Sequence, residues 1–344
     1  MDKVRVVVAD DSGFMRLLIS DILTENGSVE VIGTAVDGKD AAIKVAELRP
    51  DVLLLDMNMG EYDGLYAVKR IMSENPLPIL ILSSIGNTNL QPIFDALDLG
   101  AVDYLNKPEK GNSKLRNIEV ELIQKIKNAK RANTKAIPDP KINANTYEHT
   151  FNEKSKYDVI VIGASTGGPS AIEKVINSLP GNLNVPVLIC QHMPPNFIGS
   201  FVKRLNAMSP LQIEVGRENM RPKAGHIIVA PGESNMVVTK KRSGGVYIGF
   251  TDQVFPEYNC PSINALMLSV AEVYKDRSIG VVLTGMGKDG MLGMKQIKEQ
   301  GGYTIAQSEK SCVIYGMPKA AVEYQAVDRS IDINEIGGFL VNSL

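Results

Sequence analysis

The residues Gly163-Ala164-Ser165-Thr166-Gly167 form a G-x-S-x-G pattern whose serine could do chemistry. An apolar run ends at this pattern, and a helix-like pattern follows it. A serine in this context is lifted out on a sharp strand-to-helix turn, where its hydroxyl can act as a nucleophile. The free N–H groups at the start of the following helix point towards the same spot. We therefore take Ser165 as a candidate nucleophile.

A serine nucleophile needs a base, and the chain has three histidines. His149 lies in a polar segment, and His226 begins an apolar run, where a packed or edge position is expected. His192 follows the next apolar run after Ser165, so both should reach the same edge of a parallel sheet. Asp289 lies in a glycine-rich turn after a later apolar run and is the candidate for orienting the imidazole. Backbone N–H groups of that turn could form an oxyanion hole.

A phosphate-binding glycine turn is the alternative for the same segment. The spacing from Gly163 to Gly168 matches G-x-x-x-x-G, but no Lys-Ser/Thr follows, which argues against a Walker A loop. A dinucleotide fingerprint requires an acid about twenty residues further on, where the chain instead has Gln191-His192 after the next run. On residue chemistry alone a hydrolase is favoured, while a nucleotide-binding domain and a scaffold without catalysis stay open. A DNA-binding domain would need a basic recognition helix, and the sequence shows none.

A second group of polar side chains occupies the ends of apolar runs near the N-terminus. Asp10 and Asp11 follow the first run, Asp56 ends the third, Ser83 ends the fourth and Lys107 follows the fifth. Three converging carboxylates repel one another unless a cation lies among them, and oxygen ligands suit Mg²⁺. A lysine and a hydroxyl nearby can hold phosphoryl oxygens, which makes Asp56 the candidate acceptor of an aspartyl-phosphate.

The apolar runs that must position this second group alternate with amphipathic helical patterns. Such alternation predicts an α/β domain with a doubly wound parallel sheet, covered on both faces, over residues 1–125. The predicted strands are Val4–Ala9, Val29–Thr34, Val52–Asp56, Ile79–Ser83 and Val102–Leu105, and a last helix runs from Leu115 to Ala129.

Residues 126–156 are predicted to be a linker, because they are polar, contain prolines and lack periodicity. Alternation resumes over residues 157–344 and predicts a second doubly wound parallel sheet, Rossmann-like, with an antiparallel hairpin insertion. Its predicted strands are Asp158–Ile162, Val185–Cys190, Gln212–Val215, His226–Ala230, Val246–Phe250, Ser278–Leu283 and Tyr303–Ala306. Its predicted helices are Ser170–Ser178, Pro195–Met208, Ser262–Val273 and Gly290–Gln300.

The composition is that of ordinary globular domains, with 44% hydrophobic and 22% charged residues in a chain of 344. A formal net charge of −2 gives no general electrostatic reason to bind nucleic acid or anionic lipid. No apolar run reaches about 18 residues, so no membrane span is predicted. The chain opens into a strand-like run rather than a signal peptide, and its three separated cysteines fit a reducing cytoplasm.

Both groups of motifs resemble known families. The N-terminal pattern resembles a two-component receiver domain, which has a flavodoxin-like fold, over its whole length. Five later motifs, in order, resemble the chemotaxis protein-glutamate methylesterase family, which joins a receiver to a catalytic domain through a linker. These motifs are Ile162–Pro169, Gln191–Pro194, Ala230–Gly232, Thr284–Gly290 and Tyr315–Pro318.

The resemblance implies a serine hydrolase that removes methyl groups from glutamyl esters, and deamidates specific glutamines, on methyl-accepting chemotaxis receptors. Its implied catalytic residues are Ser165 as nucleophile, His192 as base, Asp289 as orienting acid, the Met286 N–H as oxyanion donor and Thr166 as a support of the histidine. In the receiver it implies Mg²⁺ held by Asp10, Asp11, Asp56 and the Asn58 backbone carbonyl, phosphorylation of Asp56, phosphoryl contacts from Ser83 and Lys107, and Tyr104 as the aromatic switch.

The resemblance further implies a cytoplasmic monomer that takes phosphate from a chemotaxis histidine kinase. Mg²⁺ is expected for phosphorylation, with no cofactor for the ester chemistry and no nucleic acid partner. Three positions depart from the family pattern. The loop Met59-Gly60 lacks the usual proline, Asn235 replaces a usual histidine, and Asn264 replaces a usual aspartate. We expect the two asparagines to concern substrate contacts rather than the triad.

Overall fold

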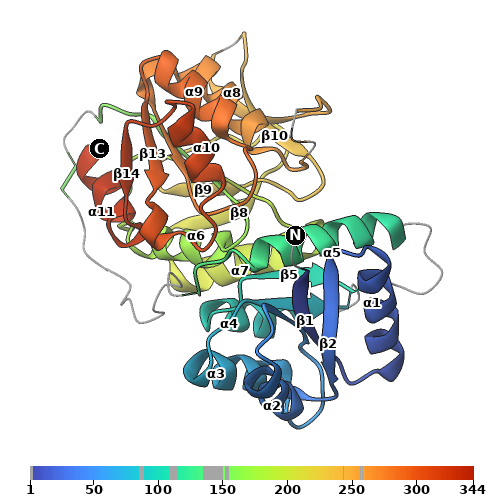
Figure 1. Cartoon of the computed structure of the whole chain (residues 1–344). Helices are drawn as coiled ribbons and strands as arrows, with labels where there is room; N and C mark the ends of the chain where they lie inside the picture. The colour runs from blue at the N-terminus through green and yellow to red at the C-terminus, as the bar shows by residue number, and fades with distance from the viewer. Residues whose placement is uncertain are drawn as a thin grey trace. The chain divides into compact units, whose positions relative to one another are not determined.

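The computed structural model describes residues 3–84, 89–107, 115–134, 150–151, 155–242, 244–255, 257 and 259–344, with the backbone alone at 115–118. The chain divides into two compact units, Met1–Pro140 and Lys141–Leu344, coloured blue to green and green to red in Figure 1. His149 and much of the predicted linker lie outside the described residues. The predicted boundaries at 125 and 156 therefore stay predictions.

The N-terminal unit is a five-stranded parallel sheet in the order β2-β1-β3-β4-β5. Its strands β3 and β4 are apolar runs buried along their whole length, as expected for a sheet covered by helices on both faces. The predicted α/β class and flavodoxin-like strand order are confirmed. The elements are β1 (Val4–Ala9), α1 (Gly13–Glu25), β2 (Val29–Ala35), α2 (Gly38–Leu48), β3 (Val52–Asp56), α3 (Gly64–Glu74), β4 (Ile79–Ser83), α4 (Gln91–Asp98), β5 (Asp103–Asn106) and α5 (Leu115–Ala129).

The C-terminal unit contains a seven-stranded parallel sheet in the order β14-β13-β12-β6-β7-β9-β8. Strands are added on one side of β6 first and on its other side later, which is the doubly wound arrangement. The sheet strands are β6 (Val159–Ala164), β7 (Val187–Gln191), β8 (Gln212–Val215), β9 (His226–Val229), β12 (Ser278–Val282), β13 (Tyr303–Gln307) and β14 (Arg329–Ile331). The α-helices are α6 (Gly168–Asn177), α7 (Pro195–Met208), α8 (Ile263–Tyr274), α9 (Met291–Glu299), α10 (Met317–Glu323) and α11 (Ile333–Ser343).

The antiparallel insertion is the hairpin of β10 (Asn235–Lys240) and β11 (Val246–Thr251), which confirms the predicted hairpin. Sequence patterns predicted only its second strand, and they also missed β14, α10 and α11. These elements are short or carry weak signals. Strand β14 has three residues, α10 has seven with a proline in its first turn, and α11 contains two glycines.

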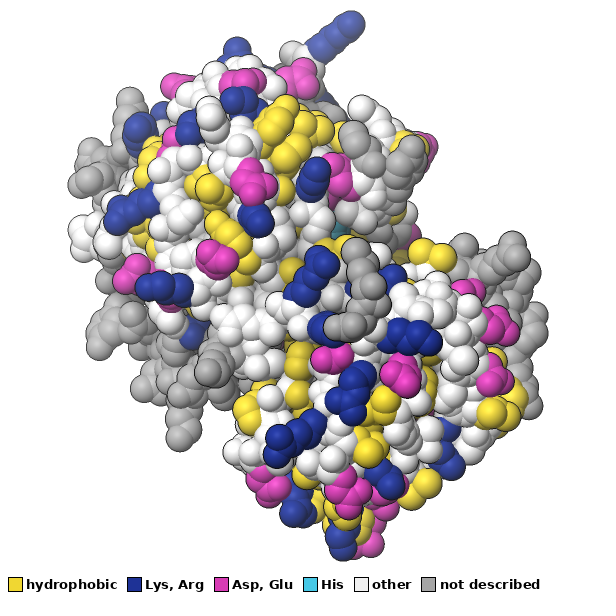
Figure 2. Space-filling model, in the orientation of Figure 1, with side chains coloured by type: hydrophobic (Ala, Val, Ile, Leu, Met, Phe, Trp, Pro, Cys, Tyr) yellow, Lys and Arg dark blue, Asp and Glu magenta, His cyan; other side chains and the backbone are white. Residues whose placement is uncertain are grey.

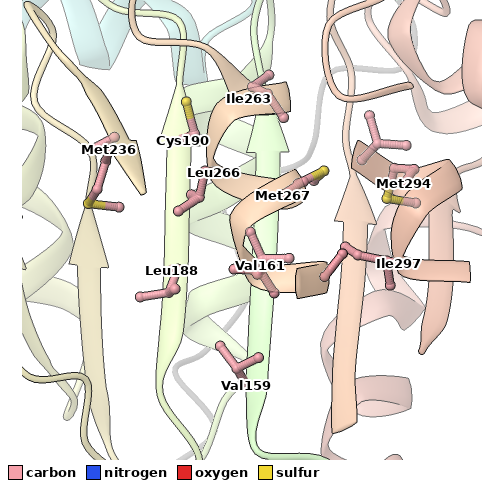
Figure 3. Close-up of a cluster of buried hydrophobic side chains, with 14 of the residues drawn as sticks. Val159, Val161, Leu188, Cys190, Met236, Ile263, Leu266, Met267, Met294 and Ile297 are labelled. Atoms are coloured by element: carbon pink, nitrogen blue, oxygen red, sulfur yellow. The ribbon is translucent and has the colours of Figure 1, made fainter. Parts of the chain in front are cut away.

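Helix α8 forms the centre of the hydrophobic core on one face of the larger sheet. Figure 3 shows Leu266 and Met267 of α8 facing Val161 of β6 and Leu188 of β7, with Met294 of α9 beside them. These five side chains are fully buried. Their burial anchors α8 across the sheet, so the N-terminus of the helix is held at the edge where β6 and β12 end.

The described surface mixes charges of both signs. On the face shown in Figure 2, Lys and Arg side chains are interspersed with Asp and Glu side chains over both units, in keeping with the net charge of −2. None of the described helices has the length and apolar character needed to cross a bilayer.

Candidate active site

Ser165 lies where strand β6 turns into helix α6. Its N–H donates to Thr284 O at 3.1 Å, which ties the turn to the end of β12, and its carbonyl accepts the Gly168 N–H at 2.7 Å. Gly167 has a φ of 73°, a left-handed conformation that residues with a Cβ rarely adopt. The turn leaves Ser165 half-buried at the carboxyl edge of the sheet.

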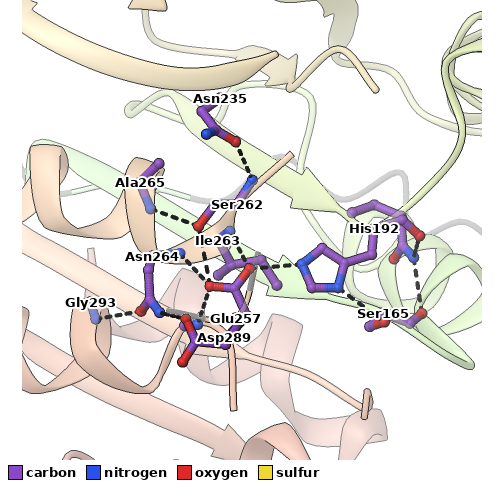
Figure 4. A network of polar contacts seen from close by, with 12 residues as sticks. Ser165, His192, Asn235, Glu257, Ser262, Ile263, Asn264, Ala265, Asp289 and Gly293 are labelled. Carbon is purple, nitrogen blue, oxygen red and sulfur yellow. Dashed lines mark hydrogen bonds and ion pairs between the residues drawn. The ribbon is translucent and has the colours of Figure 1, made fainter. Parts of the chain in front are cut away.

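His192 follows β7, the neighbour of β6, and its imidazole contacts both other candidate residues (Figure 4). Nδ1 lies 3.2 Å from Ser165 Oγ, and Nε2 lies 2.8 Å from Asp289 Oδ2. A carboxylate can only accept, so the ring proton belongs on Nε2. The lone pair of Nδ1 then faces the serine hydroxyl, as a general base requires.

Asp289 is fully buried after strand β12, the other neighbour of β6. Besides His192, Oδ2 accepts the Ile263 N–H at 2.8 Å, and Oδ1 accepts the N–H groups of Asn264 and Gly290, both at 2.9 Å. Burial alone would raise the pKa of Asp289, but its bonds to His192 and to the N–H groups of Ile263 and Asn264 outweigh burial and lower that pKa. The carboxylate is therefore ionised although it is fully buried.

The N-terminus of α8 holds this carboxylate, and sequence reasoning missed it. Ile263 and Asn264 are the first two residues of the helix, where N–H groups have no partner within the helix and the helix dipole favours an anion. Ser262 caps the helix by accepting the Ala265 N–H at 3.2 Å, and its hydroxyl also lies 3.3 Å from Asp289 Oδ1. The signal in the sequence was the Ser262 cap before a helical pattern.

The two asparagines that depart from the family pattern correct an expectation. We expected them to concern substrate contacts, but both are buried and support Asp289 (Figure 4). Asn235 Oδ1 accepts the Ser262 N–H at 2.8 Å. Asn264 adds side-chain bonds to its backbone contact, accepting the Gly293 N–H at 2.9 Å and donating to Glu257 Oε2 at 3.0 Å.

The remaining predicted residues of this unit lie around the same edge. Thr166 is buried, and its carbonyl accepts Thr284 Oγ1 at 3.0 Å. Met286 follows Gly285, whose N–H donates to Ile314 O at 3.1 Å. Their predicted roles, supporting the histidine and binding an oxyanion, stay predictions. His226 is buried as expected and pairs with Glu214 at 2.9 Å.

The N-terminal unit brings its acidic residues together at the carboxyl edge of the five-stranded sheet. Carboxylate oxygens of Asp10, Asp11 and Asp56 lie within 4.8 Å of one another. Lys107 Nζ lies 2.7 Å from Asp10 and 2.8 Å from Asp56, and Ser83 is buried at the end of β4. Three hard oxygen donors in this arrangement fit a Mg²⁺ ion.

Charge within this cluster is balanced by the lysine. Burial raises the pKa of Asp56, and Lys107 opposes that rise only in part. Burial would lower the pKa of Lys107, but its contacts with Asp10 and Asp56 reverse the direction and raise it. Tyr104 is buried, which raises the pKa of its phenol, and Asn58 is exposed in the loop after β3. The switch role of Tyr104 and the metal contact of Asn58 stay predictions.

Comparisons with known proteins agree with both units. A family model described as CheB methylesterase matches residues 160–340, and one described as response regulator receiver domain matches residues 6–119. The chain is 38% identical over 343 residues to a protein-glutamate methylesterase/protein-glutamine glutaminase of Archaeoglobus fulgidus, covering 99% of this chain and 98% of that protein. It is 39% identical over 344 residues to the protein of the same name from Clostridium acetobutylicum, with the same coverage. The crystal structure of the Thermotoga maritima CheB methylesterase catalytic domain matches with a TM-score of 0.51 at 34% identity, covering 55% of this chain and 99% of that chain.

Proposed function

Because this chain belongs to the CheB methylesterase family and carries a response regulator receiver domain, we propose that Ser165, His192 and Asp289 hydrolyse glutamyl methyl esters on methyl-accepting chemotaxis receptors. The same residues would deamidate specific receptor glutamines. The observation that carries the proposal is the imidazole of His192, which contacts the Ser165 hydroxyl on one side and the buried Asp289 carboxylate on the other. A serine, a base and an orienting acid in this geometry form the apparatus of acyl transfer.

In the proposed reaction, Ser165 Oγ attacks the ester carbonyl carbon while its proton passes to His192 Nδ1. The carbonyl π electrons move onto oxygen, and backbone N–H groups, with Met286 as the proposed donor, stabilise this oxyanion. When the intermediate collapses, the C–OCH₃ bond breaks and His192 returns its proton to give methanol. Water then attacks the acyl-enzyme by the same route and releases glutamate. With a glutamine substrate, ammonia leaves instead of methanol.

Asp289 has two tasks in this scheme. Its contact with Nε2 keeps the proton on that nitrogen, so Nδ1 can receive the serine proton. Its negative charge also stabilises the imidazolium that forms after proton transfer. Thr166 is proposed to help hold the imidazole, which is consistent with its buried position beside Ser165.

We further propose that Asp56 accepts a phosphoryl group from a chemotaxis histidine kinase and that this raises the esterase activity. Asp10, Asp11, Asp56 and the Asn58 carbonyl would hold Mg²⁺, which when bound would neutralise the carboxylates and the phosphoryl oxygens. Lys107 and Ser83 lie at the carboxyl edge of the five-stranded sheet, where they can contact the new phosphoryl group. Tyr104 would be the aromatic switch that responds to phosphorylation. The proposed enzyme is a cytoplasmic monomer without a cofactor for the ester chemistry.

Methanol release from methylated receptor tests this function directly. The full chain should release methanol, faster with Mg²⁺ and a small phosphodonor than without them. Release that is unchanged by replacement of Ser165 would contradict the serine mechanism. Methanol release at the same rate with and without the phosphodonor would contradict the proposed activation by phosphorylation. It would leave the proposed esterase chemistry in place.

A further inference from the structure

Gln191, the last residue of β7, makes contacts that the proposed mechanism does not use. Its side chain is almost fully buried, with 1% exposed. Nε2 donates to the Ser165 carbonyl at 2.9 Å and to the His192 carbonyl at 3.0 Å. A primary amide has two N–H donors, and here each is bonded to one of the two residues that exchange a proton in the proposed reaction.

The orientation of this amide follows from its neighbours. Gln191 Oε1 is buried without a hydrogen-bond partner among the described residues. Turning the amide over would direct the oxygen at two carbonyl oxygens, which is worse. The amide therefore has one favourable orientation, with both N–H groups directed at the carbonyls of Ser165 and His192.

Gly168 makes room for this amide. A Cβ at Gly168 would overlap Gln191 Oε1, and it would also lie 2.9 Å from Ala164 Cβ and 3.0 Å from the amide carbon. Gly168 is the first residue of α6, where alanine would otherwise favour the helix. The glycine at position 168 thus leaves space both for the Gln191 amide and for Ala164 Cβ at the end of β6.

We propose that Gln191 is a positioning residue. Its amide links the backbone segments that follow β6 and β7, so that Ser165 Oγ and His192 Nδ1 stay within hydrogen-bond distance of each other. The backbone link between these segments is the His192 N–H bond to Ala164 O at 3.0 Å. The Gln191 amide continues that link one residue further, to the carbonyl of Ser165 itself. The distance from Ser165 Oγ to His192 Nδ1 is already 3.2 Å, so a small drift would break the contact. This inference rests on the proposed serine mechanism.

The test compares Gln191→Met, which keeps the length of the side chain and removes both donors, with Gly168→Ala, which displaces the amide. Both variants of the full chain should lose about tenfold to a hundredfold in kcat for methanol release, because a displacement near 1 Å costs about that much. KM should stay nearly constant, since the hydrogen bonds that these variants remove end on backbone carbonyls of the enzyme and not on the substrate. Labelling of Ser165 by a phosphonofluoridate should slow in parallel with kcat.

Thr304→Val is the matched control, because it is also a buried polar residue of the large sheet and valine keeps its shape. Its hydroxyl donates to Asp328 Oδ2 at 2.9 Å and accepts the Asp328 N–H at 3.0 Å, at the start of β13 and without bonding the candidate active-site residues. This control should lower the melting temperature about as much as Gln191→Met while its kcat stays near that of the unaltered enzyme.

The outcomes separate the two proposals. If Ser165→Ala keeps normal turnover, the serine mechanism is wrong. If Ser165→Ala is inactive but folded Gln191→Met or Gly168→Ala has normal kcat, the positioning role is wrong. An equal loss of kcat in Thr304→Val would also overturn it, because the loss would then come from general loosening of the domain.

Discussion

Replacing Asp289 by asparagine should move the ring proton of His192 from Nε2 to Nδ1. The contacts of the Asp289 carboxylate show why. The new amide nitrogen must take the place of either Oδ1 or Oδ2. At Oδ1 it would face the N–H groups of Asn264 and Gly290, and at Oδ2 it would face the N–H of Ile263. Each unpaired buried donor costs about 1–3 kcal/mol. The amide nitrogen should therefore choose the Oδ2 side, where one backbone bond is broken instead of two.

That choice determines the chemistry. An amide nitrogen at the Oδ2 position donates to His192 Nε2, so the ring proton must move to Nδ1. Nδ1 then faces Ser165 with a proton and cannot act as its base. In a serine protease triad the wrong histidine tautomer lowers kcat by about 10⁴-fold, and we expect a loss of that order here, with KM nearly unchanged. The free energy of unfolding should fall by about 1–3 kcal/mol for the unpaired Ile263 N–H.

Methanol release measures the loss of kcat, urea unfolding measures the stability, and ¹⁵N spectra of labelled histidine report which ring nitrogen is protonated. Asp328→Asn is the control, because its carboxylate also accepts a backbone N–H, that of Thr304 at 2.9 Å, in the same unit. It should change stability without changing the tautomer of His192. A folded Asp289→Asn enzyme with kcat within tenfold of the unaltered enzyme, or with Nδ1 unprotonated, would refute the reasoning.

The two sites lead to four further expectations. Ser165→Ala should fold normally and lose several orders of magnitude in methanol release, more than Asp289→Asn loses. Asp56→Asn should take no phosphate from a small phosphodonor, and the unaltered chain should take none after chelation of Mg²⁺; labelling with radioactive phosphodonor checks both. Asn264→Asp should lower stability and kcat by directing a carboxylate at Glu257, and adding Glu257→Gln should recover both, whereas no recovery would rule out this pairing. Because the folded pKa of Asp289 is lowered, its contribution to stability should be complete above pH about 4 and disappear as the pH falls through that lowered value. The unfolding free energies of the unaltered chain and Asp289→Asn should then converge in acid.

The placement of the site residues that follow the strands could be predicted from the sequence, because it depends on local patterns and one topological rule. Ser165 and His192 each follow a continuous apolar run, and neighbouring parallel strands end at one edge of a sheet. The structure orders the three strands as β12-β6-β7, which puts the residues after each of them together. The same rule collected Asp10, Asp56 and Lys107 in the other unit. Patterns of types and spacing were sufficient for these side chains.

The support of Asp289 could not be predicted, because most of it comes from backbone atoms that carry no residue signature. Its N–H donors belong to Ile263, Asn264 and Gly290, and two of them are separated from it by about 25 positions. The helix that presents two of these donors is placed by core packing of Leu266 and Met267, which periodicity shows to be apolar without showing over which strand they lie.

This division explains how the site can hold Asp289 with asparagines at 235 and 264, two positions that depart from the pattern the sequence resembles. The N–H groups that hold the carboxylate would be present with many side chains at 263 and 264, provided that α8 begins there. What Asn235 and Asn264 add is the placement of that beginning, through the Ser262 N–H, Gly293 and Glu257. A different pair of polar residues can fix the same helix end if each donor still finds an acceptor. No such exchange exists for the carboxylate itself, because both of its oxygens must accept at once.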